Sequence, residues 1–359
     1  TCAPYKFVSW APNQEIVVER CEEWYQNAQG QRIRPKPFFK RIRFRILPDN
    51  TSRLLAFKTG QIDEIQLDSE QWTKETTGAE FYMKNTKASG EEWSYAFIGW
   101  NALSNPPNPF FGDKRVRRAM ALALDHDFLL NDLFSGVHRP GEGIFYPDSW
   151  MAARDLKPLH RDLDQAEKLL QEAGWKDSDR DGILDKAIDG KIVPFELTVA
   201  CPRGGSGTKV ANLMVSSLPK IGVRCRLVEP EQVAFFKDLL DKKYQSFVMA
   251  WGTGTDPDTS ANIWTTAAIK GGRNYVGFSN ARVDELYEKG KRELDRKKRA
   301  EIYAEIDRII YEEHPVTVLL YQQTLWGFSK LLRGYNPSPR GFYNFSPGPH
   351  SVWKKKTGG

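Results

Sequence analysis

Signatures of catalysis are missing from this chain of 359 residues. It contains no G-x-S-x-G nucleophile elbow, no H-E-x-x-H metal motif and no Walker phosphate loop. Its five histidines are scattered along the chain and suggest no catalytic set: His126, His138, His160, His314 and His350. We therefore expect a protein that is not an enzyme and that carries no cofactor.

Long apolar runs are missing as well. No stretch approaches the roughly 20 apolar residues that a membrane-spanning helix needs, and no secretory signal is visible. The sequence thus predicts no membrane span. If the protein is exported, its signal has been removed.

Cysteine is scarce, with four residues and no C-x-x-C pair. No histidine lies near them at ligand spacing, which argues against a zinc site. Cys2 and Cys21 lie near the open ends of an expected hairpin, and Cys201 and Cys225 lie on two strands expected to be neighbours. One or two disulfides and four buried thiols are both compatible with this spacing.

The charge is modest, +6 in total, and it is not gathered in one segment. In the densest basic run, 40–45, charged and apolar residues alternate, as on the solvent-facing side of a strand. A second run, 296–299, lies within an expected helix. Because no nucleic-acid-binding motif accompanies either run, no nucleic-acid partner is predicted.

Strand and helix signals alternate along much of the chain. From residue 195 to residue 251 the order is strand, helix, strand, helix, strand, which is typical of a parallel α/β sheet. The length suggests about two domains. Further strands are expected at 5–10, 16–19, 39–47, 62–65, 93–101 and 315–321, and further helices at 52–59, 163–173 and within 281–312.

The stretch Pro109–Asp127 reads P-F-F-G-D-K-R-V-R-R-A-M-A-L-A-L-D-H-D and predicts an amphipathic helix. Asp113 is expected to cap its first turn through its carboxylate. Val116 and Met120 recur at helical spacing on the apolar face. The basic residues of this helix are expected on the solvent-facing side: Arg115, Arg117 and Arg118.

Five segments follow one another along the chain: the A-P-Y-K-F hairpin from Ala3, Asp49–Asp63, Pro109–Asp127, the A-E-K-L-L-Q-E-A-G-W run ending at Trp175, and Trp251–Pro257. Each segment is a weak signal alone. In this order and spacing they resemble the family 5 extracellular solute-binding proteins, the peptide- and nickel-type receptors of ABC importers.

The resemblance implies an α/β protein with the periplasmic-binding-protein type II fold. The family's two crossings between lobes map near Glu92–Trp93 and Tyr321–Gln323. Residues 93–322 would then form a complete second lobe, and residues 1–92 and 323–359 part of the first lobe. The chain resembles the C-terminal two-thirds of a receptor.

The function implied by the resemblance is non-catalytic capture of a peptide or other small polar solute between two lobes. Delivery to an ABC transporter permease would follow, from a monomer located in the periplasm or outside the cell. Two alternatives stay open. The chain could be the ligand-sensing domain of a regulatory protein, or an enzyme on the same scaffold.

The expected ligand-binding residues lie at strand ends. Trp251-Gly-Thr-Gly-Thr follows a strand of the α/β sheet, where such sheets place ligand crevices, and Trp251 offers a flat stacking surface. The alternative is a plain turn capped by Asp256 or Asp258. The full set of candidates, including residues near the two crossings, is Trp251, Thr253, Thr255, Asp256, Trp100, Asn101 and Tyr321; core packing is the alternative for Trp100.

The resemblance also places an acidic residue a few positions after the tryptophan, where peptide-binding members hold the ligand's α-ammonium. This chain has Gly254 or Thr255 there, in a loop one residue shorter. Unless Asp256 takes that role, ordinary peptide binding is disfavoured.

Two further segments suggest ion binding. Residues 177–185 have the spacing of a calcium loop, with candidate ligands Asp177, Asp179, Asp181 and Asp185. Because Ile188 occupies the position of the bidentate glutamate, a structural turn is the favoured interpretation and weak calcium binding the alternative. Gly204–Gly207 precedes a helix, and either binds an anion there or serves as a flexible connection.

Overall fold

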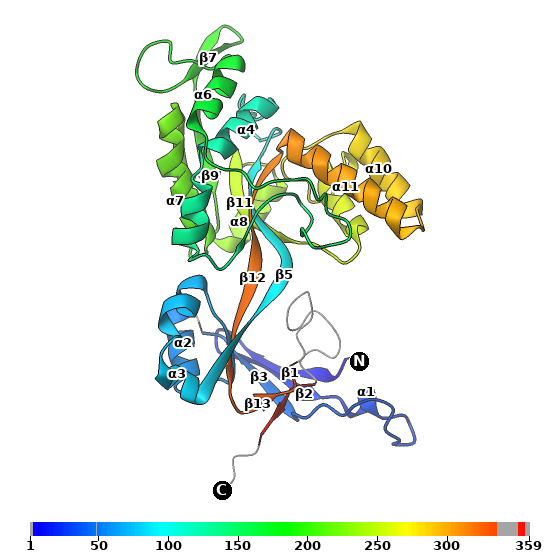
Figure 1. The fold of residues 1–359 in the computed structure, drawn as a ribbon. Coiled ribbons are helices and arrows are strands. Elements are labelled where there is room, and N and C mark those ends of the chain that lie inside the picture. The colour runs from blue at the N-terminus through cyan, green and yellow to red at the C-terminus, as the bar shows by residue number, and fades with distance from the viewer. Residues whose placement is uncertain (1–2, 48, 336–350, 356–359) are drawn as a thin grey trace. The chain divides into compact units, whose positions relative to one another are not determined.

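The computed structural model describes residues 3–47, 49–335 and 351–355. The chain divides into two compact units: unit 1 comprises Thr1–Glu92 with Gln323–Gly359, and unit 2 comprises Trp93–Gln322. The chain passes from one unit to the other within two long strands, β5 (Asn85–Trp100) and β12 (Val316–Ser329) (Figure 1).

Unit 1 contains a three-stranded antiparallel sheet in the order β1-β2-β3. Its short strand β4 pairs with the end of β12 through Trp326 and Gln66. The elements of unit 1 are β1 (Tyr5–Ala11), β2 (Glu15–Arg20), α1 (Glu22–Tyr25), β3 (Arg41–Arg45), α2 (Asn50–Lys58), β4 (Glu64–Gln66), a π-helical turn (Gln71–Glu75), α3 (Ala79–Lys84), β13 (Leu332–Arg333) and β14 (Trp353–Lys354).

Unit 2 is built on a sheet in the order β10-β9-β11-β5-β12, with the two-residue strand β6 also paired to β12. Its strands are β6 (Arg139–Pro140), β7 (Asp185–Ile188), β8 (Lys191–Pro194), β9 (Glu196–Ala200), β10 (Arg224–Val228) and β11 (Ser246–Gly252). Its main helices are α4 (Lys114–Ala123), α5 (His126–Phe128), α6 (Leu163–Glu172), α7 (Gly207–Ser217), α8 (Gln232–Leu240), α9 (Ala261–Trp264), α10 (Ala281–Arg292) and α11 (Arg296–Glu313).

The sheet of unit 2 is mixed, whereas the sequence pattern predicted a parallel sheet. Strands β10 and β11 both run parallel to β9, as predicted, but β11 pairs antiparallel with β5. The pattern from 195 to 251 covers only half of the sheet. Strands β5 and β12 come from distant parts of the chain, and the alternation carried no information about their direction.

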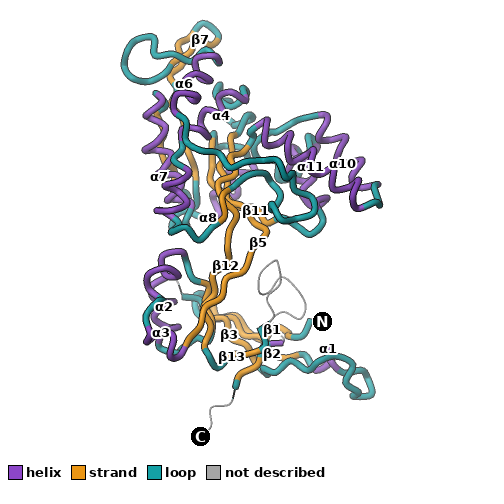
Figure 2. The backbone as a smooth tube through the Cα atoms, viewed as in Figure 1, coloured by secondary structure: helices purple, strands orange, loops and turns teal. Residues whose placement is uncertain are grey.

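Helices cover both faces of this sheet, giving three layers (Figure 2). Along β5 the side chains alternate between two apolar clusters, as the two-residue period of a strand requires. Ile98 and Trp100 pack with α4, α6 and α7, whereas Tyr95 and Phe97 pack with α10 and α11. The mixed α/β architecture therefore follows from a central strand that is apolar on both sides.

Helix α4 begins as the sequence predicts, since the Asp113 carboxylate accepts from the backbone N–H of Arg115 at 2.8 Å. One basic residue of this helix differs from the prediction. Arg117 is buried rather than solvent-facing. Its guanidinium donates to the carbonyl oxygens of Phe111 (2.8 Å) and His314 (3.1 Å) and also bonds Glu313. Carbonyls at the end of α11 lack helical partners, and Arg117 supplies their donors.

The cysteines of unit 2 are thiols. Cys201 and Cys225 are buried and unbridged, which rules out the disulfide that the spacing left open. The parallel register pairs Cys225 with Leu197, so the two cysteines lie about 13 Å apart along the strands, beyond disulfide reach. Burial raises the pKa of the Cys225 thiol to about 12. Cys2 lies outside the described residues, so pairing of Cys2 with Cys21 stays an expectation.

In the part of the chain that the structure describes, every helix is too short or too polar to cross a lipid bilayer.

Replacing Arg117 by methionine tests the contact between α4 and the end of α11. Methionine keeps much of the buried volume but leaves the carbonyls without donors. We expect Arg117→Met to lower the free energy of unfolding by about 2–3 kcal/mol in urea denaturation. Arg118→Ala on the same helix is the control, with an expected change of about 0.5 kcal/mol or less. Equal effects of the two substitutions would contradict this role for Arg117.

Candidate functional site

The loop after β11 is tied to the start of unit 2. Thr253 is buried, and its hydroxyl donates to the carbonyl oxygen of Trp93 at 2.9 Å; its backbone N–H donates to the same oxygen. These contacts fix the direction in which the chain leaves the strand. They also give predicted site residue Thr253 a positioning role beside Trp251.

Trp251 lies partly exposed at the end of β11, among aromatic rings. It stacks on Phe97 with ring centroids 6.5 Å apart and on Tyr275 at 5.9 Å. Such offset stacking favours one orientation of the ring. A second stacked pair, Trp93 on Tyr146 at 6.0 Å, lies at the start of the unit, where Thr253 is anchored.

Arg273 lies over the Trp251 ring, with its guanidinium carbon 4.8 Å from the ring centroid. The side chain is exposed, and it donates to the Asn262 side-chain oxygen at 3.2 Å. Among the described residues, no carboxylate lies within 4.0 Å of its guanidinium. A guanidinium held on an aromatic face can still donate to a ligand carboxylate, and its planar shape suits that group. The sequence did not single out Arg273.

The acidic residues of the loop after β11 already accept hydrogen bonds from within the chain. Asp256 accepts two hydrogen bonds from Arg299, at 2.9 and 3.1 Å, and also caps the short helix that follows by accepting from the Asp258 N–H at 3.0 Å. Asp258 accepts from Arg299 at 2.8 Å. Hydrogen bonding to Arg299 lowers the pKa of Asp256. Asp256 is therefore the turn-capping residue of the alternative interpretation, and its oxygens are bound to the chain itself.

Arg299 connects this loop to the helical layer. It donates to the carbonyl oxygen of Gly290 at 2.9 Å and lies over the ring of Trp150, 5.6 Å from its centroid. Trp150 in turn donates from its indole nitrogen to the Thr255 carbonyl oxygen at 3.3 Å. Thr255 thus contributes its backbone to the network. Arg299 was missed because it stands in the basic run 296–299, where neighbouring residues have the same charge.

The three predicted residues near the crossings are buried. Trp100 is 0% exposed, and its indole N–H donates to Thr317 at 2.9 Å. The Asn101 side-chain amide donates to the Tyr244 carbonyl at 2.8 Å, and the Tyr321 hydroxyl lies 2.6 Å from the Gly143 carbonyl oxygen. For Trp100 the structure supports the core-packing alternative. Tyr321 belongs to the buried cluster against which Trp251 packs, whereas Trp100 belongs to the cluster on the other face of the sheet. Each of the three has a polar atom hydrogen-bonded inside unit 2.

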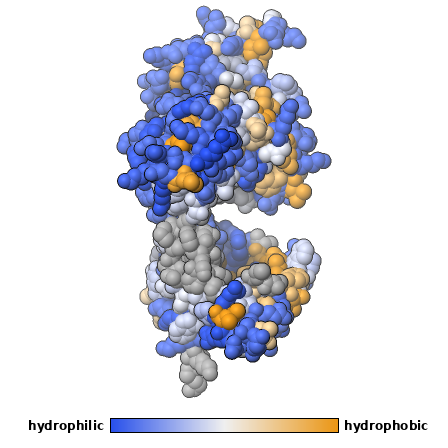
Figure 3. All heavy atoms as spheres, turned by 90° about the vertical axis from the view of Figure 1, so that its right-hand side faces the viewer, coloured by the Kyte–Doolittle hydropathy of each residue, from blue (hydrophilic) through white to orange (hydrophobic). Residues whose placement is uncertain are grey.

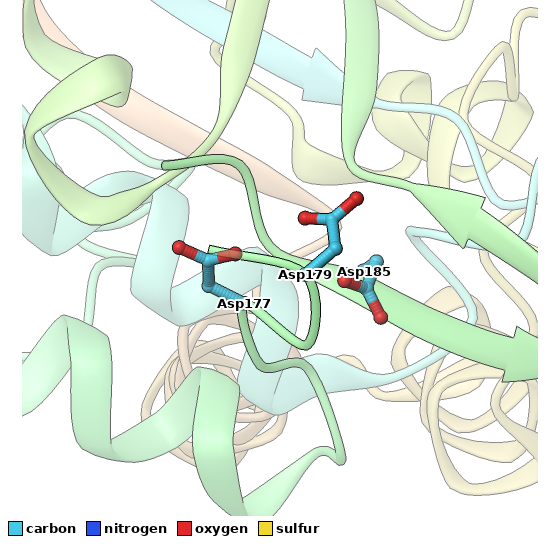
Figure 4. Close-up of side chains that lie close together, drawn as sticks. All are labelled: Asp177, Asp179 and Asp185. Atoms are coloured by element: carbon cyan, nitrogen blue, oxygen red, sulfur yellow. The ribbon is translucent and has the colours of Figure 1, made fainter. Parts of the chain in front are cut away.

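The predicted calcium loop brings three carboxylates together (Figure 4). Oxygens of Asp177, Asp179 and Asp185 lie within 4.8 Å of one another, without Asp181. The same oxygens hold the turn. Asp177 accepts from the N–H of Asp181 and of Gly182, at 3.1 and 3.0 Å, and Asp185 is buried against Ser178, whose hydrogen bonds lower the pKa of Asp185. The loop is ordered by its own backbone donors, which supports the structural-turn interpretation.

The glycine-rich stretch 204–207 leads into α7. A Cβ atom at Gly207 would lie 3.3 Å from the Cys201 side chain and 3.6 Å from that of Val248. Gly207 therefore allows α7 to pack closely on the sheet. Close packing of α7 on the sheet is therefore a sufficient reason for a glycine at position 207, and a bound anion is not needed to explain it.

A family model matches this chain over residues 1–272, which is more than half of its length. The model is described as bacterial extracellular solute-binding proteins, family 5, middle.

Relatives of known name and structure agree with this match. The chain is 29% identical over 353 residues to the oligopeptide-binding protein AppA of Bacillus subtilis (strain 168), covering 95% of this chain and 60% of AppA. The solved structure of AppA, in complex with a nonapeptide, superposes with a TM-score of 0.83 and 28% identity over 98% of this chain and 66% of that one. The fold is thus that of periplasmic peptide-binding proteins, type II.

Two other solved structures have the same fold at lower identity. DppA of Helicobacter pylori, in complex with the peptide STSA, has a TM-score of 0.81 at 21% identity, covering 98% of this chain and 63% of that one. NikZ of Campylobacter jejuni, in complex with Ni(L-His), has a TM-score of 0.80 at 23% identity, covering 98% and 68%. The chain spans 60% of AppA and 44% of the Escherichia coli dipeptide-binding protein.

Removing the Arg299 guanidinium tests its hold on the loop. Arg299→Met deletes the donors to Asp256 and Asp258, so we expect the amides of residues 253–260 to exchange hydrogen about tenfold faster or more, by mass spectrometry. Arg299→Lys should recover only part of the protection, because an ammonium group cannot reproduce the bidentate contact. The matched control is Arg292→Met, on an arginine whose side chain is 84% exposed. Unchanged exchange in Arg299→Met would show that the loop is held by other contacts.

The acidic turn is tested by calorimetry. Because its carboxylates already accept from backbone and serine donors, titration with millimolar CaCl2 should give no heat beyond that of dilution. Asp185→Ala should lower the melting temperature, since the Ser178 contacts are lost. A saturable calcium heat that disappears in Asp177→Asn would revive the metal interpretation.

Proposed function

We propose a receptor function on one premise: the chain belongs to the bacterial extracellular solute-binding proteins of family 5. In this proposal it binds a peptide or another small polar solute without chemical conversion and delivers it to the permease of an ABC importer. The relatives support this class, since AppA and DppA are named for peptide binding and NikZ was solved with Ni(L-His). The site of action is the periplasm or the cell exterior, and the working form is a monomer.

The observation that carries the proposal is the partly exposed Trp251 with Arg273 on its ring. An aromatic surface gives a ligand apolar contact, and a guanidinium adds directional hydrogen bonds. Together they form a surface on unit 2 that suits a solute with an apolar part and an anionic group.

We also propose that unit 2 is the complete second lobe of a type II receptor and that unit 1 is part of the first lobe. Enclosure of the ligand by two lobes is inferred from the family resemblance alone. Lobe closure would be driven by contacts that the ligand makes only in the closed state.

The charges around Trp251 favour a carboxylate-bearing ligand within this class. Asp256 and Asp258 are bound to Arg299, so they are poorly placed to hold a ligand ammonium group. Arg273 is the charged group at Trp251 that has hydrogen-bonding capacity to spare. A peptide would then be recognised through a carboxylate rather than through its amino terminus.

The second candidate function is ligand sensing within a regulatory protein. A sensor domain would bind its ligand on the same surface at Trp251 and Arg273. The complete gene separates the two: a signal peptide and neighbouring permease genes support the receptor, and a fused helix-turn-helix domain supports the sensor. An enzyme on the same scaffold would require turnover of a bound ligand, lost on mutation of Asp256 and Asp258.

Arg273→Ala and Trp251→Ala test the proposed surface. With a ligand identified by thermal-shift screening of peptides and small acids, each substitution should weaken binding to the full-length protein by about 10-fold to 100-fold in calorimetry. Arg273 is exposed, so we expect Arg273→Ala to melt close to the parent protein. Trp251→Ala loses the stacking on Phe97 and Tyr275 and should melt lower, so circular dichroism is used to check that this variant is folded at the assay temperature.

The matched control for this test is Arg292→Ala, which removes an exposed arginine from α10 and should leave the affinity unchanged. Affinity that survives both Arg273→Ala and Trp251→Ala would place the ligand elsewhere and overturn the proposal for this surface.

A further inference from the structure

Asp307 is a buried carboxylate on the inner side of α11, where it is 1% exposed. Figure 3 shows unit 2 from the side of α10 and α11, where hydrophilic residues predominate on the surface. The neighbouring Arg308 is directed to Asp155, at 2.9 Å. Within the described residues, no lysine, arginine or histidine nitrogen lies within 4.0 Å of the Asp307 carboxylate. Because a buried carboxylate is costly unless its oxygens are satisfied, its hydrogen-bond partners indicate its role.

These partners are backbone N–H groups of segment 144–153, which follows β6 in the chain. One carboxylate oxygen accepts from the Ile144 N–H at 2.7 Å, and the other accepts from the Ala153 N–H at 3.1 Å. A Cβ atom at position 143 would collide with the carboxylate, so Gly143 permits this close approach. Asp307 therefore holds both ends of the segment.

The segment carries two aromatic residues that contact the candidate site. Trp150 donates to the Thr255 carbonyl oxygen at 3.3 Å. Tyr146 stacks on Trp93 at 6.0 Å, and the carbonyl oxygen of Trp93 accepts from Thr253. Both routes end on the loop after β11. The segment thus connects the buried carboxylate to the ligand surface.

We propose that Asp307 is a positioning residue of the ligand surface at Trp251. It fixes segment 144–153 and, through that segment, the loop after β11. This inference rests on the proposed function, because a solute bound at Trp251 is what makes the position of the loop important. Asp307 touches no ligand itself, so its effect on affinity is indirect.

The titration of Asp307 gives this role a pH dependence. Burial raises the pKa of the Asp307 carboxyl from 3.8 to about 7, although the N–H donors of the segment act in the opposite direction. The stability that this group contributes is therefore fully present below its ordinary pKa and is lost as the pH rises through 7. The same linkage applies to an opening that lets water reach the carboxylate. Segment 144–153 should consequently be held less firmly at pH 8 than at pH 6.

No neighbouring group is expected to mask this titration in the part of the chain that the structure describes. The groups that interact electrostatically with Asp307 are Tyr95 on β5, Tyr287 on α10, Tyr321 on β12 and Arg308 on α11. Burial raises the pKa of each of the three tyrosines, so they stay neutral near pH 7. On the segment itself, Asp148 is exposed and pairs with Arg139 at 2.6 Å.

Asp307→Asn tests the proposal by hydrogen-exchange mass spectrometry of the complete chain without ligand. Asparagine keeps the shape and one acceptor, but it directs an NH2 group toward the segment in place of the second acceptor. We expect the amides of 144–153 and 253–256 to exchange about threefold faster or more, while those of β9 and β10 are unchanged. The matched control is Asp155→Asn, which removes the same charge from a side chain that is 61% exposed and should leave all of these amides unchanged.

Gly143→Ala perturbs the same contact from the other side and keeps the carboxylate. The added methyl group collides with Asp307, so the amides of 144–153 and 253–256 should again exchange faster. This variant tests the contact independently if Asp307→Asn does not fold.

A pH series and an affinity measurement complete the test. Between pH 6 and pH 8 the parent chain should lose protection of 144–153 relative to Asp307→Asn, because the asparagine does not titrate and the intrinsic exchange rates change equally in both. With the ligand of the Arg273→Ala experiment, Asp307→Asn should weaken binding about threefold to tenfold at pH 6.

Three results would overturn the proposal: unchanged exchange of 253–256 in both variants, unchanged affinity in Asp307→Asn, or a relative protection of 144–153 that is the same at pH 6 and pH 8. The exchange measurements need no ligand. A failure of the Arg273 and Trp251 variants would therefore count against the proposed function alone, and it would be distinguishable from a failure of Asp307 to hold the loop.

Discussion

The contact of Arg299 with Asp256 and Asp258 is the interaction on which the candidate site depends. One guanidinium holds both carboxylates and a helix carbonyl, and it lies against Trp150, which bonds the backbone of the same loop. A bidentate contact of this kind fixes orientation as well as distance. It connects the loop after Trp251 to the helical layer of unit 2. It also determines which charged groups are available to a ligand. Asp256 and Asp258 are paired with Arg299, whereas Arg273 keeps hydrogen-bond donors for a ligand.

The sheet of unit 2 explains why the site has a rigid base. Strand β5 is apolar on both sides, so each face is covered by helices, and Trp251 on the neighbouring β11 projects toward the same layer as Phe97. Trp100, Asn101 and Tyr321 belong to this base. Their burial and satisfied polar atoms hold the strands in place, and this role is separate from contact with a solute.

Local signals predicted the elements well, because caps and apolar periods act over a few residues. Asp113 begins α4 as expected, and Asp49 caps α2 through the Ser52 N–H at 2.7 Å. Long-range contacts could not be predicted in the same way. Arg117 and Arg299 stand among other basic residues, and nothing in the local pattern separates the buried Arg117 or the half-buried Arg299 from its solvated neighbours. The family resemblance located the loop at Trp251, but the engagement of its acids emerged only from the fold.

The central claim is that the ligand surface of unit 2 recognises an anionic group. The most direct measurement compares two probes that differ in that group alone, by calorimetry with the full-length protein: an N-acetyl tripeptide with a free carboxylate and the same peptide as its C-terminal amide. The arrangement of Arg273 and Arg299 predicts that the acid binds about 10-fold more tightly or better, as expected for loss of one charged hydrogen bond. Equal or tighter binding of the amide would contradict it.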